Sequence, residues 1–216
     1  MSDSYVTQVD SKDYLQPPYL NKGRLSTYWL LVKTVWGLNP KPSSILEIGP
    51  GNKVVTSFLR TMGFLVETLD LDETVQPDYV LGVTDLTYAD IGKKFDLVIA
   101  SQVLEHIQFD DFIKVLSNLR DVTQNLMITL PDTSRGAMFF SLSIKLPKFR
   151  RKLFVRKYRY KKPKHTFNGQ HYWEIGKKGY SIKYVKEIIE ENGWCIKEDF
   201  LNPEYGYHRF FILEAK

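Results

Sequence analysis

The stretch "SILEIGPGNKV", residues 44–54, decides the fold of this chain. An apolar run from Ile45 to Ile48 leads directly into the turn Gly49-Pro50-Gly51. Such a run, ended by residues that favour a sharp turn, predicts a buried strand, and the residues at 53–62 then have helical spacing. A strand, a glycine turn and a helix in this order are typical of nucleotide-binding proteins.

Short apolar runs alternate with helical patterns on both sides of this stretch. Strands joined by helical crossovers form a mostly parallel sheet with helices on both faces, which is a doubly wound α/β fold. The expected strands are 44–48, 64–70, 79–82, 95–101 and 125–130, and the expected helices lie near 25–37, 53–62, 87–92 and 109–120.

The C-terminal end has a different pattern. Ser181 is a favourable N-cap for a helix that runs to about Asn192, and Gly193 ends that helix. The segments "WCIKEDF" and "HRFFILEA" then predict two strands. Because a short connection joins them, we expect the pair to be antiparallel.

Length and composition favour one globular unit. With 216 residues, 43% of them hydrophobic, the chain can bury a full core, so we expect a single domain over residues 1–216. An N-terminal cap of about 1–40 and a basic insertion of about 134–173 complete it. No apolar run reaches the roughly 18 residues of a spanning helix, the start lacks an apolar signal core, and the single Cys195 fits a reducing compartment. These features predict a cytoplasmic protein, with peripheral attachment to the inner face of the membrane left open.

Charge is distributed unevenly along the chain. Residues 133–173 contain twelve Lys and Arg and no Asp or Glu, whereas the remainder holds 18 basic against 25 acidic residues, a formal charge of −7. One segment therefore makes the whole chain basic, at a net charge of +5. Such a segment suits a phosphorylated substrate, an anionic membrane or an RNA backbone, and a solvated surface loop is the alternative.

Acidic residues stand at the ends of three predicted strands. Glu47 precedes the glycine turn, and a dinucleotide fingerprint is disfavoured because Val54 replaces its third glycine. Asp70 lies 19 residues after Gly51 and ends the second strand, where a carboxylate can accept hydrogen bonds from ribose hydroxyls. Asp85 follows the third strand. Three acids placed in this way suit a ligand with an amino acid, a ribose and an adenine.

Residues 43–131 resemble a class I S-adenosylmethionine-dependent methyltransferase, of the group often called type 11. The resemblance implies a Rossmann-like sheet whose last strand is inserted antiparallel. It is carried by the order and spacing of "LEIGPG" (46–51), "TLDLD" (68–72), "VTDL" (83–86), "FDLVIASQVLEHI" (95–107) and "MITLP" (127–131).

The resemblance also implies that eight positions bind S-adenosyl-L-methionine. Some of these positions let the backbone approach the cofactor, and the others recognise its methionine group or its nucleoside. Gly49 and Gly51 let the backbone approach the cofactor, Glu47 lies near its methionine amino end, Asp70 holds the ribose, Asp85 with the Leu86 backbone meets the adenine, and Ser101 and Gln102 line the methionine and sulfonium side.

Two histidines are candidate catalytic bases for a hydroxyl acceptor. His106 in "VLEHI" lies, by the resemblance, close to the methyl group, and bracing the turn is its alternative role. His171 in "TFNGQHYWEIG" stands among aromatic residues and beside Glu174, and anchoring its loop is the alternative. No metal site is expected, because the histidines lack partners at ligand spacing and the chain has one cysteine.

The expected acceptor is a small molecule, a glycan or a lipid-linked molecule, methylated on oxygen. Amino methylation of nucleobases commonly uses an Asn/Asp-Pro-Pro-aromatic motif after the fourth strand, where this chain has Ser101-Gln102-Val103-Leu104. The "QPPY" at 16–19 follows no apolar strand, and Tyr14 or Tyr19 is expected to cover the cofactor. Residues 138–164 are expected to contact an anionic membrane, and nucleic acid is disfavoured. An RNA methyltransferase and a non-catalytic S-adenosylmethionine-binding scaffold remain the alternatives.

Overall fold

The computed structural model describes residues 5–9, 11–17, 19–146, 149–158, 163–167 and 169–216. For the stretches 135–146 and 149–158 this description covers the backbone alone. Among the helices of the described residues, none is both long enough and apolar enough to cross a bilayer.

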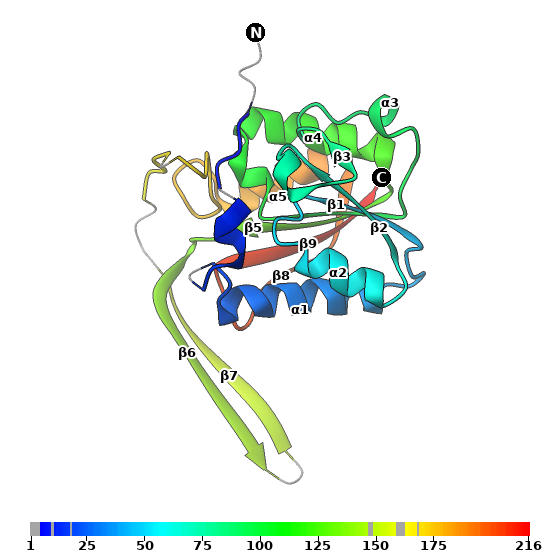
Figure 1. The fold of residues 1–216 in the computed structure, drawn as a ribbon. Helices are drawn as coiled ribbons and strands as arrows, with labels where there is room; N and C mark the ends of the chain where they lie inside the picture. Colours follow the sequence, from blue (N-terminus) through cyan, green and yellow to red (C-terminus); the bar gives the residue numbers. More distant parts are fainter. Residues whose placement is uncertain (1–4, 10, 18, 147–148, 159–162, 168) are drawn as a thin grey trace.

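A seven-stranded sheet forms the centre of the molecule, in the order β3-β2-β1-β4-β5-β9-β8 (Figure 1). The first five strands are parallel, and β9 is antiparallel to both of its neighbours. This order confirms the predicted Rossmann-like fold and its antiparallel C-terminal strand. The bounds are β1 (Ser44–Ile48), β2 (Leu65–Asp70), β3 (Tyr79–Val80), β4 (Leu97–Ser101), β5 (Asn125–Pro131), β8 (Trp194–Leu201) and β9 (His208–Ala215).

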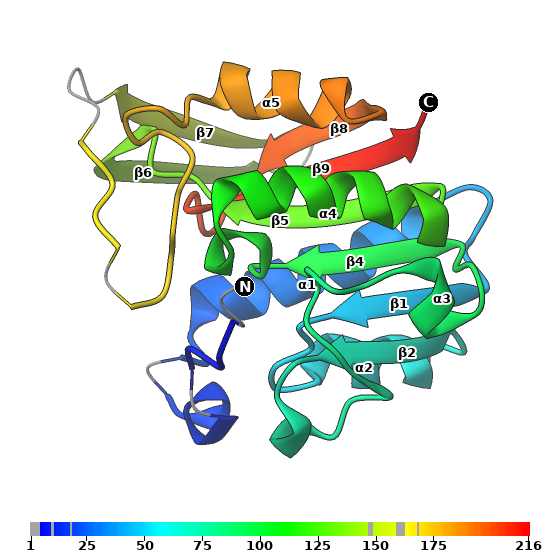
Figure 2. The same ribbon diagram turned by 90° about the horizontal axis from the view of Figure 1, so that it is seen from above.

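Helices cover both faces of the sheet. Figures 1 and 2 show α1 and α2 on one face and α3, α4 and α5 on the other. Strand β1 supplies both layers of the core, since Ile45 packs with the first helix pair whereas Leu46 and Ile48 pack with α4 and α5. The bounds are α1 (Lys22–Gly37), α2 (Val54–Thr61), α3 (Tyr88–Ile91), α4 (Phe109–Val122) and α5 (Ile182–Glu191), with short 3-10 helices at η1 (Ser11–Leu15), η2 (Glu73–Val75) and η3 (Leu104–His106).

The capping residues explain where two of the helices begin. Ser181 caps α5 as predicted, with its hydroxyl accepting from the Tyr184 amide at 3.1 Å. The first helix begins earlier than the predicted residue 25, because the Asn21 side chain accepts from the Arg24 amide at 3.0 Å. Asparagine is among the strongest N-cap residues, so it fixes this start.

A separate two-stranded sheet occupies most of the predicted insertion. Strands β6 (Arg135–Leu146) and β7 (Phe149–Tyr158) pair antiparallel, with Phe140 opposite Val155 and Leu146 opposite Phe149. No element was predicted here. Basic residues interrupt the apolar pattern of β7, whereas in β6 the alternation of Phe140, Leu142, Ile144 and Leu146 with polar residues is a strand signal that was missed. The predicted membrane contact of 138–164 depends on side chains that lie outside the described part of the structure.

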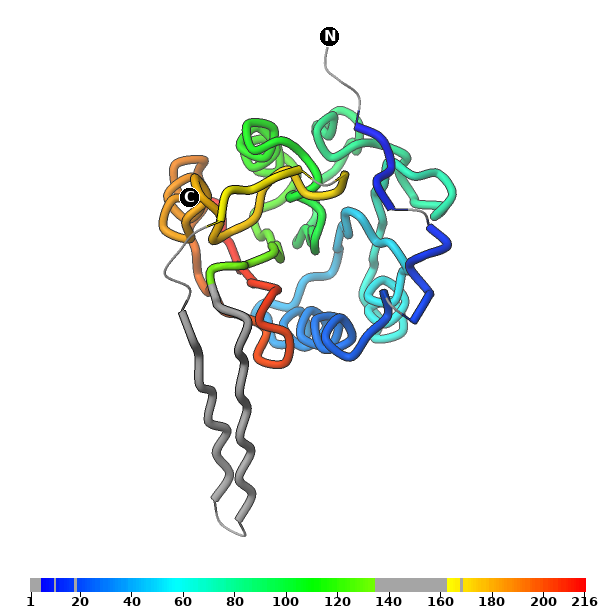
Figure 3. Tube along the Cα trace, turned by 90° about the vertical axis from the view of Figure 1, so that its left-hand side faces the viewer, coloured from blue at the N-terminus to red at the C-terminus, as the bar shows by residue number. Residues whose placement is uncertain are grey.

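Three segments surround the ends of the parallel strands. Figure 3 looks at these ends and shows the N-terminal segment, the loop that leads to Gly176 and the turn between β8 and β9 arranged around them. These segments come from distant parts of the sequence.

Candidate active site

A cavity of about 430 Å³ lies at the carboxyl ends of β1, β2 and β4. The N-terminal segment and the loop before α5 complete its wall. A cavity of this size fits the range of small-molecule and cofactor sites, which is about 300–1,000 Å³. Its position is also the usual one, because ligands of open α/β sheets bind outside the carboxyl ends of the strands.

The glycine turn forms one wall of the cavity. Gly49 and Gly51 have φ values of 66° and 49°, in the left-handed region that side chains disfavour. A Cβ atom on Gly49 would collide with Cγ2 of Val103. The backbone at Gly49 therefore approaches Val103 more closely than any other residue type allows, and the predicted approach of this turn to a cofactor stays a prediction.

The Tyr14 ring lies against the same turn, 3.5 Å from the Cβ position of Gly51. Asn52 holds it there, because its side-chain amide donates to the Tyr14 carbonyl at 3.3 Å and to the Tyr28 hydroxyl at 3.1 Å. Both Tyr14 and Tyr19 line the cavity. Asn52 was not predictable as a site residue, because its role depends on a partner 38 residues earlier.

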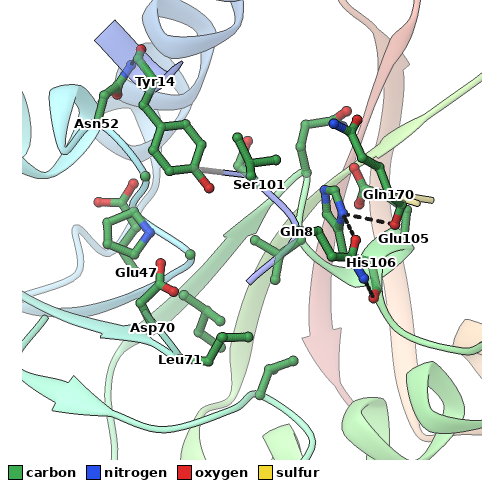
Figure 4. Close-up of a pocket in the computed structure, with 18 of the residues that line it drawn as sticks. Gln8, Tyr14, Glu47, Asn52, Asp70, Leu71, Ser101, Glu105, His106 and Gln170 are labelled. Atoms are coloured by element: carbon green, nitrogen blue, oxygen red, sulfur yellow. Dashed lines mark hydrogen bonds between the residues drawn. The ribbon is translucent and has the colours of Figure 1, made fainter. Parts of the chain in front are cut away.

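Two predicted carboxylates lie beside this turn (Figure 4). Glu47 is buried, accepts a hydrogen bond from the Thr56 hydroxyl, and has its pKa raised to about 7 by burial. Burial also raises the pKa of Asp70, whose Oδ1 accepts from the Asp72 amide at 2.9 Å. Acidic groups held in a partly dry cavity attract cationic groups strongly.

Ser101 and Gln102 end β4 in the middle of the cavity wall. The Ser101 hydroxyl lies 2.8 Å from the Thr129 hydroxyl, and the Gln102 side chain donates to the same oxygen at 3.2 Å. Gln102 has a φ of 58°, so the chain turns sharply at this position. Thr129 on β5 thus anchors both predicted residues.

Asp85 and Leu86 do not line the cavity. Asp85 is exposed, and Leu86 is completely buried in the core between the sheet and α4. Three apolar residues that the sequence analysis did not name line the cavity near the ends of β2 and β3, namely Leu71, Leu81 and Val83. The adenine-binding role of Asp85 and the Leu86 backbone stays a prediction.

His106 lies at the opposite end of the cavity from Glu47 and Asp70 (Figure 4). Its Nδ1 atom is 2.7 Å from the side-chain oxygen of Gln8 and 3.2 Å from the carbonyl oxygen of Gln170. Because a carbonyl oxygen can only accept, Nδ1 carries the proton and Nε2 carries the lone pair. Burial lowers the pKa of His106 to about 4, so its imidazole is neutral.

His171 stands beside it, with the two rings 5.0 Å apart between centroids and nearly perpendicular. Its Nδ1 atom is 2.9 Å from Oε1 of Glu174, which also accepts from the Tyr207 hydroxyl at 2.8 Å. Burial lowers the pKa of His171, but the Glu174 hydrogen bond and the charge of Glu105 outweigh it and hold the pKa above its ordinary value. Burial raises the pKa of Glu174, yet the hydrogen bonds from His171 and Tyr207 bring it down to about 2.

Glu105 completes this end of the cavity. Its side chain is fully buried, and neither carboxylate oxygen has a hydrogen-bond partner among the described residues. Burial raises its pKa to about 7, against the lowering effect of the His171 charge. The sequence analysis did not name Glu105, although it precedes His106 directly.

The structure brings one ligand atom from each of Glu105, His106 and His171 within 4.8 Å of one another. The expectation of no metal site considered spacing along the chain alone and stays a prediction, whereas the fold places His171 beside a pair that lies 65 residues earlier. The remaining histidines have other partners. His208 lies 2.9 Å from the Thr27 hydroxyl, and His165 lies 2.7 Å from the His171 carbonyl oxygen.

Solved structures of low sequence identity share this fold. An S-adenosylmethionine-dependent methyltransferase from Clostridium acetobutylicum is 10% identical with a TM-score of 0.56, covering 94% of this chain and 95% of its own. A Burkholderia thailandensis 1,6-didemethyltoxoflavin-N1-methyltransferase with bound substrate and S-adenosylhomocysteine is 13% identical with a TM-score of 0.58, covering 92% and 80%. The glycopeptide N-methyltransferase MtfA with S-adenosylmethionine is 13% identical with a TM-score of 0.58, covering 92% and 96%.

The similar structures show the fold of the chain, whereas a match to a protein family shows its family. None of the curated proteins compared with the chain matches it. The family model described as "Methyltransferase domain" matches residues 22–201, which include every strand of the seven-stranded sheet except β9. The chain therefore belongs to this methyltransferase family and is a class I S-adenosylmethionine-dependent methyltransferase.

Proposed function

We propose that the protein transfers a methyl group from S-adenosylmethionine to a hydroxyl group of a small-molecule, glycan or lipid-linked acceptor. One observation carries this proposal: a single cavity holds the glycine turn with Glu47 and Asp70 at one end and the His106–His171 pair at the other (Figure 4). The first end suits the donor and the second suits the acceptor.

The residues at the donor end fit S-adenosylmethionine. Gly49 and Gly51 line the cavity with backbone alone, and the Tyr14 ring lies against Gly51. Glu47 would hold the cationic amino group, and Asp70 at the end of β2 would accept from the ribose hydroxyls. Leu71, Leu81 and Val83 offer apolar contact to the adenine. Ser101 and Gln102 would line the methionine and sulfonium side.

The chemistry requires alignment of the acceptor more than covalent participation by the protein. S-adenosylmethionine supplies a methyl group on a positively charged sulfur, and the S–CH3 bond breaks with its electron pair remaining on sulfur as the acceptor oxygen forms the new C–O bond. The acceptor's hydroxyl proton must leave. The protein therefore has to orient the oxygen in line, exclude water and weaken the O–H bond.

His106 and His171 are the residues that activate the acceptor in this proposal. Each makes its hydrogen bonds through Nδ1, so Nε2 is the nitrogen without a hydrogen bond to any described residue. His106 is neutral because burial lowers its pKa, and the neutral form of either imidazole can take a proton or bind a cation. Glu174 holds His171 in place, since a carboxylate on Nδ1 fixes both ring orientation and tautomer.

The acceptor class is the finer part of the proposal. The printed names of two similar structures describe enzymes that act on 1,6-didemethyltoxoflavin and on a glycopeptide, both by N-methylation. For this chain the histidine pair supports oxygen instead, because a hydroxyl needs a base or a cation more than an amine does. The basic segment at 138–164 supports a lipid-linked acceptor presented at an anionic membrane surface, in the cytoplasm.

Calorimetry with S-adenosylmethionine and its demethylated product tests the donor end. We expect the wild-type protein to bind both compounds, and Asp70→Ala to weaken the binding at least about tenfold, which corresponds to about 1.4 kcal/mol. Asp121→Ala, at an exposed position of α4, is the matched control and should bind as wild type does. Absence of binding by the wild-type protein would contradict the donor assignment.

A transfer assay identifies the acceptor. Cell extract incubated with the enzyme and methyl-labelled S-adenosylmethionine is fractionated into small molecules, glycans, lipids, RNA and protein. Label in small molecules, glycans or lipids, stable to conditions that cleave methyl esters, supports the proposal. Label confined to RNA assigns an RNA methyltransferase, and binding of the cofactor without any transfer assigns a scaffold.

A further inference from the structure

We propose that Glu105, His106 and His171 bind a divalent transition-metal ion at the acceptor end of the cavity. The proposal deepens the function proposed above and rests on it, because the ion would hold and acidify the acceptor hydroxyl. These three residues would supply all the protein ligands of the ion.

The three side chains form a ligand set of a recognisable type. Two imidazoles and one carboxylate are the ligands of many catalytic zinc sites and of non-haem iron sites. Their ligand atoms already lie within 4.8 Å of one another. Ligands of a tetrahedral ion with metal–ligand distances of about 2.0–2.1 Å lie roughly 3.4 Å apart, so closure requires side-chain movements of about 1 Å.

Hydrogen bonds at the far side of each ring prepare both imidazoles for this role. His171 donates from Nδ1 to Glu174 at 2.9 Å, and His106 donates from Nδ1 to oxygens of Gln8 and Gln170 at 2.7 and 3.2 Å. Metal-binding histidines almost always donate their other nitrogen to a carboxylate or a carbonyl. The structure thus provides the outer hydrogen bonds of a metal site as well as the ligands.

The surroundings of Glu105 favour a bound cation independently of the hydrogen bonds to the two imidazoles. A completely buried carboxylate whose oxygens accept no hydrogen bond from any other described residue is costly, because burial removes the water that would stabilise its charge. The charges of His171 and Arg24 act on it, yet neither residue donates a hydrogen bond to it. A cation bound between Glu105 and the two imidazoles would compensate this charge directly.

A three-ligand site leaves coordination positions open. Zn²⁺ fits two imidazoles and a carboxylate by ligand type, and its catalytic sites keep a position for water or substrate. An oxygen bound there loses its proton near neutral pH, as zinc-bound water does at a pKa of about 7. The acceptor class that follows is an alcohol or a phenol, and an ether or amide oxygen would gain nothing.

Direct metal binding tests the inference without any assay of transfer. The purified protein, stripped with a chelator, is titrated with Zn²⁺ by calorimetry and with Co²⁺ by visible absorption. We expect one equivalent to bind, and the Co²⁺ form to show the intense bands of four- or five-coordinate geometry. Glu105→Gln and His171→Ala should each weaken binding at least tenfold, and Glu174→Gln should weaken it about 10–100-fold through loss of the outer hydrogen bond.

Asp70→Asn is the control, because it alters a carboxylate of the same cavity at the donor end. Asp70→Asn should bind the metal ion as the wild type does and bind S-adenosylmethionine more weakly. Glu105→Gln should bind the metal ion more weakly and S-adenosylmethionine as the wild type does, which would show that this variant is folded. Stoichiometric binding of neither ion by the wild-type protein, or unchanged binding by both ligand variants, overturns the metal site. Cofactor binding measured in the presence of chelator separates that outcome from failure of the proposed function.

Discussion

Glu47 is a carboxylate in the interior of a central strand, and if it binds the cofactor as proposed, its surroundings would couple that binding to pH. Burial raises its pKa to about 7, while the Thr56 hydrogen bond and the charge of Arg60 work in the other direction. Without a cationic ligand the folded protein therefore keeps this group protonated at mildly acidic pH. A cationic amino group placed beside it would favour the ionised form and release the proton.

Comparison with Glu47→Gln measures this effect in the cofactor-free protein. Because the pKa is raised on folding, the native state binds the extra proton between the unfolded value of about 4.3 and the folded value of about 7. The stability of the wild type relative to the variant should therefore fall by about 1.4 kcal/mol per pH unit from pH 5 to 7 and level off above pH 7. Urea unfolding at several pH values gives the two curves, and parallel curves would contradict the assignment.

Gly49 and Gly92 offer a matched pair for the close approach at the turn. Both have positive φ values, 66° and 72°, but a Cβ on Gly49 collides with Val103 whereas a Cβ on Gly92 has nothing within 4 Å. We expect Gly92→Ala to cost about 1 kcal/mol and Gly49→Ala roughly 2–4 kcal/mol, with loss of cofactor binding only in the latter. Denaturant unfolding and calorimetry measure the two effects, and equal costs would argue against the contact.

At the scale of elements, local signals and distant contacts differ in what can be predicted. The strand before Gly49 and the helix after it were predictable because their patterns lie within a few residues. Ser181 likewise marked its helix. The pairing of Glu105 and His106 with His171 was not predictable, since it depends on how a loop 65 residues away folds back. Basic residues obscure the pattern of β7, whereas the alternating apolar residues at 140–146 made β6 predictable although it was missed.

The basic and aromatic residues of the segment 138–164 predict binding to an anionic membrane. Each Lys or Arg near an anionic bilayer contributes about 1 kcal/mol, and inserted Phe side chains make binding less sensitive to salt. We expect the protein to sediment with anionic but not neutral vesicles, and the double variant Phe139→Ser, Phe140→Ser to release it at high salt. Equal, negligible binding to both lipids would contradict the membrane contact. RNA binding would instead fall steeply with salt and change little in this variant.

At the scale of the whole molecule, the cavity joins segments that are otherwise independent. The N-terminal segment contacts both the glycine turn and η3, since Asn52 donates to the Tyr14 carbonyl and Gln8 donates to the His106 carbonyl at 3.1 Å. Tyr5 adds a hydrogen bond to Asp111 on α4. A ligand that fills the cavity therefore contacts residues from both halves of the sheet and from its covering segments.

This arrangement predicts that the cofactor stabilises the fold as a whole. At 100 times its dissociation constant, a ligand that binds only the native state adds about 2.7 kcal/mol. For a chain of this size that should raise the melting temperature by about 5–10 °C. Thermal unfolding with S-adenosylmethionine measures the shift, which Asp70→Ala should reduce by about half or more and Asp121→Ala should preserve.

Strand β9 follows every other strand in the sequence, yet it lies inside the sheet between β5 and β8. A chain emerging from the ribosome therefore completes β5 long before the strand that covers it exists. Until residues 208–215 appear, the edge of β5 presents unpaired backbone groups beside the apolar side chains of its own faces. Such an edge is a template for pairing with another chain, so the nascent protein is most exposed to mispairing in the interval between the synthesis of these two strands.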